Sequence, residues 1–241
     1  MKIVDAFWEK RNLGVECIEI HIDDTDSVEA IEKAYSAIEE KEYMVARIPS
    51  VNPDTLFFFE QQGYRFIEAA ITLENNMNSI NPPLRIMRVC EKCSYAPMNE
   101  NDIAVMETQI DKNIFKTDRI YIDPFFTKAH AAQRYKFWIR DIIAKGGFPH
   151  KVIFNGETVG FFVNQQISTG VYDGLFAATY QQYEGSGMGI CVQYMGLKMA
   201  MENGAKKYIG HISCNNPDVF KALIMLNFNV KKTEYVLIKH L

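Results

Sequence analysis

The stretch Glu184-Gly185-Ser186-Gly187-Met188-Gly189 joins a predicted strand to a predicted helix. VYDGLFAATY (171–180) precedes it with a strand pattern, and ICVQYMGLKMAMENG (190–204) follows with a helical pattern that ends at Gly204. Free N–H groups at a helix start, together with the helix dipole, attract phosphate, and glycine lets a ligand approach the backbone closely. The stretch is therefore a candidate phosphate-binding loop, although a tight turn also needs glycines for its backbone angles.

Two common phosphate-binding motifs do not fit this loop. A dinucleotide fingerprint requires GxGxxG in an N-terminal βαβ unit, with an acidic residue about twenty residues later. A nucleotide P-loop requires Gly-Lys followed by Ser or Thr. The glycines here meet neither requirement, so another phosphate-bearing ligand is expected.

Strand and helix patterns continue on both sides of the loop. Pro217 stands in the first turn of one predicted helix, and Asn155-Gly156 marks a hairpin. The predicted helices are NENDIAVMETQI (99–110), TKAHAAQRYKFWIRDIIAK (127–145) and NNPDVFKALIMLN (215–227); the predicted strands are IMRVCEKC (86–93), KVIFNGETVGFFVNQQ (151–166, as a hairpin), KKYIGHIS (206–213) and NVKKTEYVLIKHL (229–241).

A smaller unit precedes these segments. It has predicted strands at CIEIHI (17–22), YMVARIP (43–49) and AAITLE (69–74), and helices at SVEAIEKAYSAIEE (27–40) and NPDTLFFFEQQG (52–63). ENNMNSINPP (74–83) is polar and closed by two prolines, which is typical of a linker. We therefore predict an α/β fold (α+β, with a mixed sheet) in two domains, residues 1–80 and residues 81–241.

Composition narrows the functional classes. Of 241 residues, 48% are hydrophobic, and the formal net charge of −4 leaves no basic surplus for nucleic acid or a membrane surface. No apolar run is long enough for a membrane span, and the start MKIVDAFWEKRNLGV lacks a signal-peptide core, so we expect a soluble cytoplasmic protein. Cys90 and Cys93 form a single CxxC with no second pair or nearby histidine, so we expect free thiols and no metal.

The glycine loop resembles that of the Gcn5-related N-acetyltransferase superfamily, whose pyrophosphate loop has the pattern Q/R-x-x-G-x-G/A. Here the pattern runs from Glu184 to Gly189, and Asn216 stands twelve residues before Phe228, as the family's strand-to-helix Asn stands before a Gly-Phe pair. The order of elements from about Arg85 to Leu241 is also similar. The resemblance implies the acyl-CoA N-acyltransferase fold, with acetyl-CoA as the cofactor and a small-molecule amine as the acceptor.

Within the superfamily, the chain is most similar to the bacterial enzymes that acetylate the amine of dTDP-fucosamine. Those enzymes also begin with a small α/β domain, and the similarity lies in AFWEKRNLGV (6–15), RIPSVNPDTLFFFEQQGYRFIE (47–68) and DRIYIDP (118–124). This resemblance implies a nucleotide-sugar acceptor, with Arg119 and Tyr121 as candidate acceptor-binding residues. Tyr135 and Trp138 on the 127–145 helix are expected to serve core packing. We also expect a homodimer, the commonest soluble oligomer.

The resemblance further implies how the cofactor binds. The pantetheine arm is expected to pair with the strand from Leu175 to Ala178, and an N–H near Phe176 or Ala177 is expected to donate to the thioester carbonyl. The amides of Gly185, Ser186, Gly187, Met188 and Gly189 are expected to bind the diphosphate. Asn216 is expected to contact pantetheine, to cap the next helix, or to do both.

Three positions depart from the family pattern. Glu184 replaces the Arg or Gln that normally begins the loop, which places an acidic side chain near the diphosphate. Leu223 stands where many members have a Tyr that protonates the departing thiolate, and leucine has no proton to donate. Asn227 replaces a Gly, a tolerable change because Asn also enters the left-handed region. Lys198 and Lys206 cannot be placed from the sequence well enough to count as compensation for Glu184.

An amine acceptor must lose a proton before it attacks, so a base is expected near the thioester. Asp173 is the first candidate, by alignment with a general-base Glu of related enzymes, and the alternative is a solvated strand-edge Asp. His211 on the following strand is the second candidate, and the alternative is a structural histidine. Two other functions stay open: acyl transfer to an amino acid or peptide amine, and a non-catalytic acyl-CoA-binding module.

Overall fold

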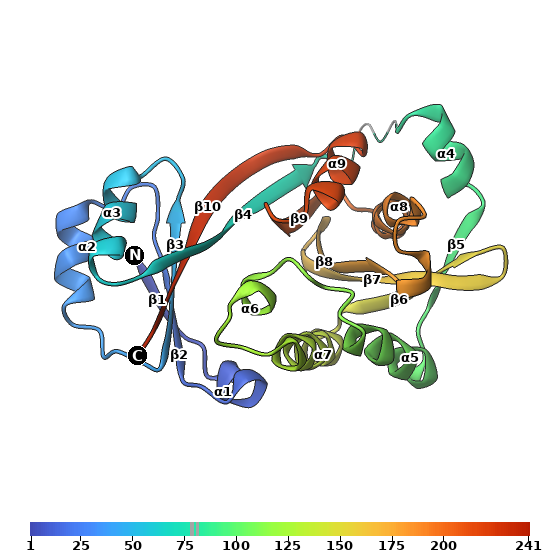
Figure 1. The fold of residues 1–241 in the computed structure, drawn as a ribbon. Helices are drawn as coiled ribbons and strands as arrows, with labels where there is room; N and C mark the ends of the chain where they lie inside the picture. The colour runs from blue at the N-terminus through green and yellow to red at the C-terminus, as the bar shows by residue number, and fades with distance from the viewer. Residues whose placement is uncertain (78–79, 81) are drawn as a thin grey trace.

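The computed structural model describes residues 1–77, 80 and 82–241. Within them the strands form one mixed sheet in the order β1-β2-β3-β10-β4-β9-β8-β7-β6-β5 (Figure 1). The strands are β1 (Lys2–Asp5), β2 (Cys17–His21), β3 (Tyr43–Pro49), β4 (Arg65–Asn75), β5 (Cys93–Pro97), β6 (Phe148–Phe154), β7 (Glu157–Ser168), β8 (Val171–Thr179), β9 (Lys207–Ser213) and β10 (Asn229–His240).

Helices cover both faces of this sheet. In the right half of Figure 1, α8 and α9 lie above the sheet and α5 to α7 lie below it. The helices are α1 (Trp8–Leu13), α2 (Val28–Tyr35), α3 (Pro53–Gln61), α4 (Leu84–Cys90), α5 (Glu100–Asp111), α6 (Arg119–Ile122), α7 (Lys128–Ala144), α8 (Met188–Glu202) and α9 (Pro217–Met225), with a 3₁₀ turn η1 (Gln181–Tyr183). None of the described helices has the length and apolar character that crossing a bilayer requires.

Strand β4 joins the two predicted domains. It pairs antiparallel with β9 on one side and with β10 on the other, and β10 also pairs with β3. The backbone hydrogen bonds of AAITLE (69–74) therefore go to strands from the end of the chain. The sheet is continuous on both sides of residue 80, and the division into domains at that residue stays a prediction.

The predicted linker is shorter than expected. Glu74 and Asn75 belong to β4, where they pair with Ile209 and Tyr208 of β9. Asn75 is buried, and its amide donates to the carbonyl of Leu226 at 2.9 Å. Its polarity therefore serves a buried hydrogen bond. Residues 78, 79 and 81 of the predicted linker lie outside the described residues.

Local signals placed most of the elements correctly. Ser27, Asn99 and Thr127 cap α2, α5 and α7 by accepting a backbone N–H near the helix start. Asn155 and Gly156 both have positive φ, 51° and 84°, in the hairpin between β6 and β7. These features depend on a few neighbouring residues, which is why the sequence alone could indicate them.

The predicted strand IMRVCEKC (86–93) is wrong. Pro83 precedes helix α4, and the next strand, β5, begins only at Cys93. A short apolar run fits a buried strand and one face of a helix equally well, and here packing against α8 selects the helix. Cys90 and Cys93 are both buried free thiols, and the Cys90 sulfur lies 3.2 Å from that of Cys191 in α8.

Candidate functional site

Strands β8 and β9 separate halfway along their length. Their parallel pairing runs from Val171 opposite Lys207 to Gly174 opposite Gly210, and the described residues show none beyond that point. β8 nevertheless continues to Thr179, still paired with β7 on its other side, and β9 continues to Ser213. Leu175, Phe176 and Ala177 lie on this part of β8, so their backbone edge faces the gap left by β9. An extended ligand can add to such an edge as a further strand does.

A tight contact marks the point of separation. Gly174 packs against the Tyr208 side chain so closely that a Cβ on Gly174 would overlap the phenol ring. The Tyr208 hydroxyl donates to Asn164 at 2.6 Å, and the Asn164 amide donates to the Gly196 carbonyl of α8 at 2.9 Å. Beyond Gly174, the extra residue Leu175 interrupts the register between β8 and β7. Such bulges bend strands and are frequent next to active sites.

The loop that follows β8 is open to solvent. Glu184, Gly185, Ser186, Gly187 and Gly189 are all exposed, and a Cβ on any of the three glycines would meet no atom within 4 Å. Gly185 and Gly187 have φ of 74° and 80°, where glycine avoids strain. In the described part of the chain, the amides of Gly185, Gly187 and Gly189 have no hydrogen-bond partner. These donors at the start of α8 are therefore available to an anionic ligand.

Two contacts fix the shape of the loop. The Ser186 hydroxyl donates to the carbonyl of Tyr183 at 2.5 Å and accepts from the amide of Met188 at 3.3 Å. The second bond occupies the Met188 N–H, and the Ser186 N–H donates to the Tyr183 carbonyl at 3.2 Å. Two of the amides expected to bind the diphosphate therefore already have partners. Gly187 takes the cap position of α8, and its left-handed backbone directs the chain into the helix.

Glu184 is not an isolated negative charge. The ammonium of Lys116, in the segment between α5 and α6, lies 2.7 Å from one of its carboxylate oxygens and 3.0 Å from the other. Both side chains are partly exposed. From the sequence, Lys198 and Lys206 were the lysines weighed as compensating charges for Glu184. Lys116 was missed because it is 68 residues away from Glu184.

The two candidate bases lie together where β8 and β9 separate. Asp173 belongs to the last paired residues of β8, and His211 is the first residue of β9 after the pairing ends. The His211 Nε2 atom is 3.3 Å from a carboxylate oxygen of Asp173, and the Nδ1 atom is 3.4 Å from the hydroxyl of Thr72 in β4. The second carboxylate oxygen of Asp173 is buried and has no partner among the described residues. Thr72 was missed because only the position of β4 beside β9 brings it here.

Aromatic side chains cover β8 on the face of α7. Phe176 is buried under Trp138 and Tyr135, with ring centroids 4.8 Å and 5.9 Å away. Phe115 stacks on Tyr135 at 4.3 Å. The expected packing role of Tyr135 and Trp138 is therefore confirmed, although Trp138 keeps 39% of its surface exposed.

The residues of α9 occupy structural positions. The Asn216 side chain accepts from the amide of Val219 at 3.2 Å and caps the helix. Leu223 is buried in the core with Phe228. Asn227 has a φ of 64°, so the expectation that Asn replaces Gly in the left-handed region is confirmed. The described contacts of Asn216 fit a cap, and its expected contact with pantetheine stays a prediction.

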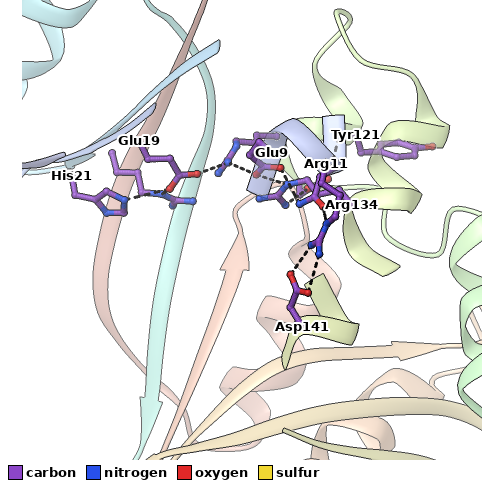
Figure 2. Close-up of polar contacts among 11 residues, drawn as sticks. Glu9, Arg11, Glu19, His21, Tyr121, Arg134 and Asp141 are labelled. Carbon is purple, nitrogen blue, oxygen red and sulfur yellow. Dashed lines mark hydrogen bonds and ion pairs between the residues drawn. The ribbon is translucent and has the colours of Figure 1, made fainter. Parts of the chain in front are cut away.

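Arg119 lies inside a buried ion cluster, shown in part in Figure 2. Its guanidinium is 2.5 Å from Glu19 of β2 and 3.6 Å from Glu9 of α1. Arg134 of α7 contacts the same Glu9 at 2.8 Å. Burial alone would raise the pKa of Glu19, but Arg119 and the other nearby cations hold that pKa well below its ordinary value.

Tyr121, the other predicted acceptor-binding residue, lies close to the buried ion cluster (Figure 2). Its ring lies under the ammonium of Lys128, 3.7 Å from the centroid, and Lys128 also donates to the Tyr121 carbonyl. Arg119 and Tyr121 thus both have partners within the protein. Their roles in acceptor binding stay predictions.

The fold is that of the Gcn5-related N-acetyltransferases. One similar solved structure is such an enzyme from Sphaerobacter thermophilus, with 12% identity and a TM-score of 0.58 over 88% of this chain and 64% of that one. Another, from Kribbella flavida, has 14% identity and a TM-score of 0.55 over 92% of this chain and 80% of that one. This chain therefore spans about two thirds to four fifths of the length of these two structures.

A third similar structure contains a Gcn5-related glucosamine N-acetyltransferase region in a fungal multi-domain β-N-acetylglucosaminidase. It has 10% identity and a TM-score of 0.62 over 99% of this chain and 31% of that one. No protein-family profile and no curated protein matches the sequence. These likenesses establish the fold.

Proposed function

We propose that this protein transfers an acetyl group from acetyl-CoA to the amine of a small acceptor. The observation that carries the proposal is the gap between β8 and β9, which has free loop amides beyond one strand and the Asp173–His211 pair at its closed end. The residues present fit the cofactor: the unpaired edge of β8 suits an extended pantetheine arm, and the exposed amides at the start of α8 suit a diphosphate.

Acetyl-CoA supplies the activated acetyl group as a thioester. Leu175, Phe176 and Ala177 present backbone groups along the gap, and an N–H near Phe176 or Ala177 would stabilise negative charge on a carbonyl oxygen. The aromatic side chains over Phe176 keep water from this face of β8. Leu223 has no acidic proton, so the proton for the leaving thiolate has another source in this proposal.

Asp173 and His211 have different roles in removing the proton from the acceptor amine. A carboxylate only accepts hydrogen bonds, so the contact with Asp173 places the imidazole proton on Nε2. The other nitrogen, Nδ1, is then free to receive a proton when the Thr72 hydroxyl turns away. The His211 side chain is 52% exposed, whereas that of Asp173 is 14% exposed. We therefore assign the acceptor's proton to His211 and an orienting role to Asp173, reversing the ranking that the sequence favoured.

Three classes of amine are candidates for the acceptor. A dTDP-amino sugar remains the acceptor predicted from the sequence resemblance, but it carries a diphosphate, and Arg119 already neutralises buried carboxylates. The solved fungal region described as a glucosamine N-acetyltransferase makes free amino sugars a second class worth testing. Amino acid and peptide amines are the third. A homodimer and a cytoplasmic location stay predictions from the sequence.

Binding and turnover test the proposal separately. Calorimetry measures the binding of acetyl-CoA, and release of free thiol measures transfer to dTDP-4-amino-4,6-dideoxygalactose, glucosamine, amino acids and short peptides. We expect micromolar binding and turnover with at least one amine. Binding without turnover on any amine would favour the non-catalytic acyl-CoA-binding alternative, and no binding would exclude both.

A further inference from the structure

The ion pair between Lys116 and Glu184 stands where related proteins are expected to have a cationic or neutral residue. Glu184 is the first residue of the loop, and the Lys116 ammonium contacts both of its oxygens. An exposed ion pair contributes little to stability, because water screens it and two flexible side chains must be ordered. The pair is thus too weak to matter much for folding, and its position beside the free loop amides indicates a role in ligand binding.

The backbone near Lys116 is held firmly, although its ammonium is exposed. The neighbouring Phe115 stacks on Tyr135 and contacts Phe161 and Phe176 through ring edges. These contacts anchor the segment between α5 and α6 to the face of β8. The Lys116 side chain then extends from a fixed position toward the start of the loop.

Lys116 is also the cation best placed for this role. Residues 185–197, which include the loop and the first turns of α8, contain no charged side chain. Lys198 lies ten residues beyond Met188, about 15 Å along the helix, and is near Glu202. The side chain of Lys206 lies beside Gly170 at the opposite end of α8. Neither lysine considered from the sequence compensates for Glu184 at the loop.

We propose that Lys116 supplies the positive charge that binds the diphosphate of the cofactor, and that Glu184 holds it in place. A lysine ammonium has three N–H donors. Two are directed to the oxygens of Glu184, which leaves one for a phosphate oxygen beside the amides of Gly185 and Gly187. The segment between α5 and α6 thereby replaces the side chain that the loop lacks. This inference rests on the proposed function, because it requires that acetyl-CoA binds at this loop.

Calorimetry of acetyl-CoA binding tests the inference in four proteins: wild type, Lys116→Met, Glu184→Gln and the double variant. We expect Lys116→Met to weaken binding about tenfold in the wild-type background, with a smaller loss at 0.5 M salt because ions screen the exposed charge. In the Glu184→Gln background the loss should also be smaller, because Lys116 is no longer held in place there. Lys112→Met is the matched control, since it removes an exposed lysine of the same segment. We expect it to change affinity less than twofold.

Three results would overturn the inference. The first is unchanged affinity in Lys116→Met while the wild type binds. The second is full recovery of affinity in the double variant, which would mean that Lys116 only neutralises Glu184. The third is a loss that disappears with dephospho-coenzyme A, which would assign Lys116 to the 3′-phosphate. If the wild type itself does not bind acetyl-CoA, the proposed function fails as well, so the two failures are distinguishable.

Discussion

Polar groups in the buried ion cluster are paired with each other, whereas several polar groups at the gap between β8 and β9 are unpaired. In the cluster, Glu9, Glu19, Arg119 and Arg134 are almost fully buried, and each lies near an opposite charge (Figure 2). At the gap, the amides of Gly185, Gly187 and Gly189 and one oxygen of Asp173 have no partner among the described residues. The charges of the cluster are matched within the protein, although the buried Arg119 Nε has no hydrogen-bond partner among the described residues. The unpaired groups beside the gap are available to a ligand.

Removing one arginine from the buried ion cluster should have the largest effect on stability. Arg134→Met leaves the carboxylate of Glu9, which is 0% exposed, with the longer contact to Arg119 and a hydrogen bond from the Asn12 amide at 3.2 Å. We expect a loss of about 3–5 kcal/mol in the free energy of unfolding, because a buried charge would lose its main partner. Urea denaturation measures it. Acetyl-CoA affinity per folded molecule is expected to stay unchanged.

Arg11→Met is the matched control, because Arg11 forms an exposed ion pair with Asp141 at 2.6 Å (Figure 2). Its loss should be at most about 1 kcal/mol. Equal losses in the two variants would show that burial does not distinguish these arginines. A large loss of acetyl-CoA affinity in Arg134→Met would show that the cluster also shapes the ligand site.

A substitution at the gap between β8 and β9 is expected to change the rate of acetyl transfer more than the stability of the fold. Asp173→Asn is expected to lower kcat about a hundredfold, because Asn can present an N–H to Nε2 of His211 and reverse the position of the imidazole proton. Stability should change by less than about 1 kcal/mol, since the lost contact is partly exposed. Asp111→Asn, which affects an exposed ion pair with Lys136, is the control. A loss of activity below threefold would remove Asp173 from the mechanism.

The sequence predicted those parts of the fold that depend on neighbouring residues. The strand, loop and helix around the glycine stretch and the Asn155-Gly156 hairpin follow from short patterns and are confirmed. The place of β4 between β9 and β10 could not be predicted, because it depends on pairing across more than 130 residues of chain. α4 was missed because a run of seven residues is too short for its period to separate helix from strand.

The same distinction applies to the site. Asp173 was a candidate by alignment with a general-base Glu of related enzymes, and His211 because it stands on the following strand. The sheet brings the two into contact. Thr72 and Lys116 reach the site from distant segments, and nothing in their local sequence sets them apart from other surface residues. Arg119 was a candidate through the resemblance of DRIYIDP (118–124), and its burial could be seen only once Glu9 and Glu19 were placed around it.

Two glycines of the loop, Gly187 and Gly189, differ in backbone conformation. Gly187 has a φ of 80°, whereas Gly189 has ordinary helical geometry, and neither has a neighbour that a Cβ would touch. Gly187→Ala is therefore expected to cost about 1–2 kcal/mol through backbone strain alone. Gly189→Ala should be neutral or slightly stabilising, because Ala favours a helix. Thermal unfolding of the two variants measures the difference.

Acetyl-CoA affinity should follow the same order, since strain at Gly187 displaces the free amides around it. We expect a loss of several-fold for Gly187→Ala and little change for Gly189→Ala. Equal affinities in the two variants would mean that the amides before α8 do not set the binding of the cofactor.

A substitution at Glu68 of β4 has the smallest expected effect. Glu68 is buried like the charges of the ion cluster, but within the described part of the chain it keeps one unpaired oxygen, like the free groups at the gap. It is 6% exposed, and one carboxylate oxygen has no partner among the described residues. Burial raises its pKa above the ordinary value, against the smaller opposing effects of Ser213 and Arg119. A raised carboxyl pKa means that the folded state binds its proton more readily than the unfolded state. The charged carboxylate therefore destabilises the fold increasingly as the pH rises through that pKa.

Glu68→Gln is accordingly expected to stabilise the protein by about 1 kcal/mol at pH 8, since it removes a buried charge and keeps the shape of the side chain. The advantage should shrink as the pH falls and be lost below the ordinary glutamate pKa, where the wild-type side chain is protonated in both states. Glu234→Gln, which breaks a contact with Lys232 at 3.0 Å, should not stabilise. Loss of stability in Glu68→Gln at pH 8 would instead assign Glu68 to the ion cluster, as a partner of Arg119 and Arg47.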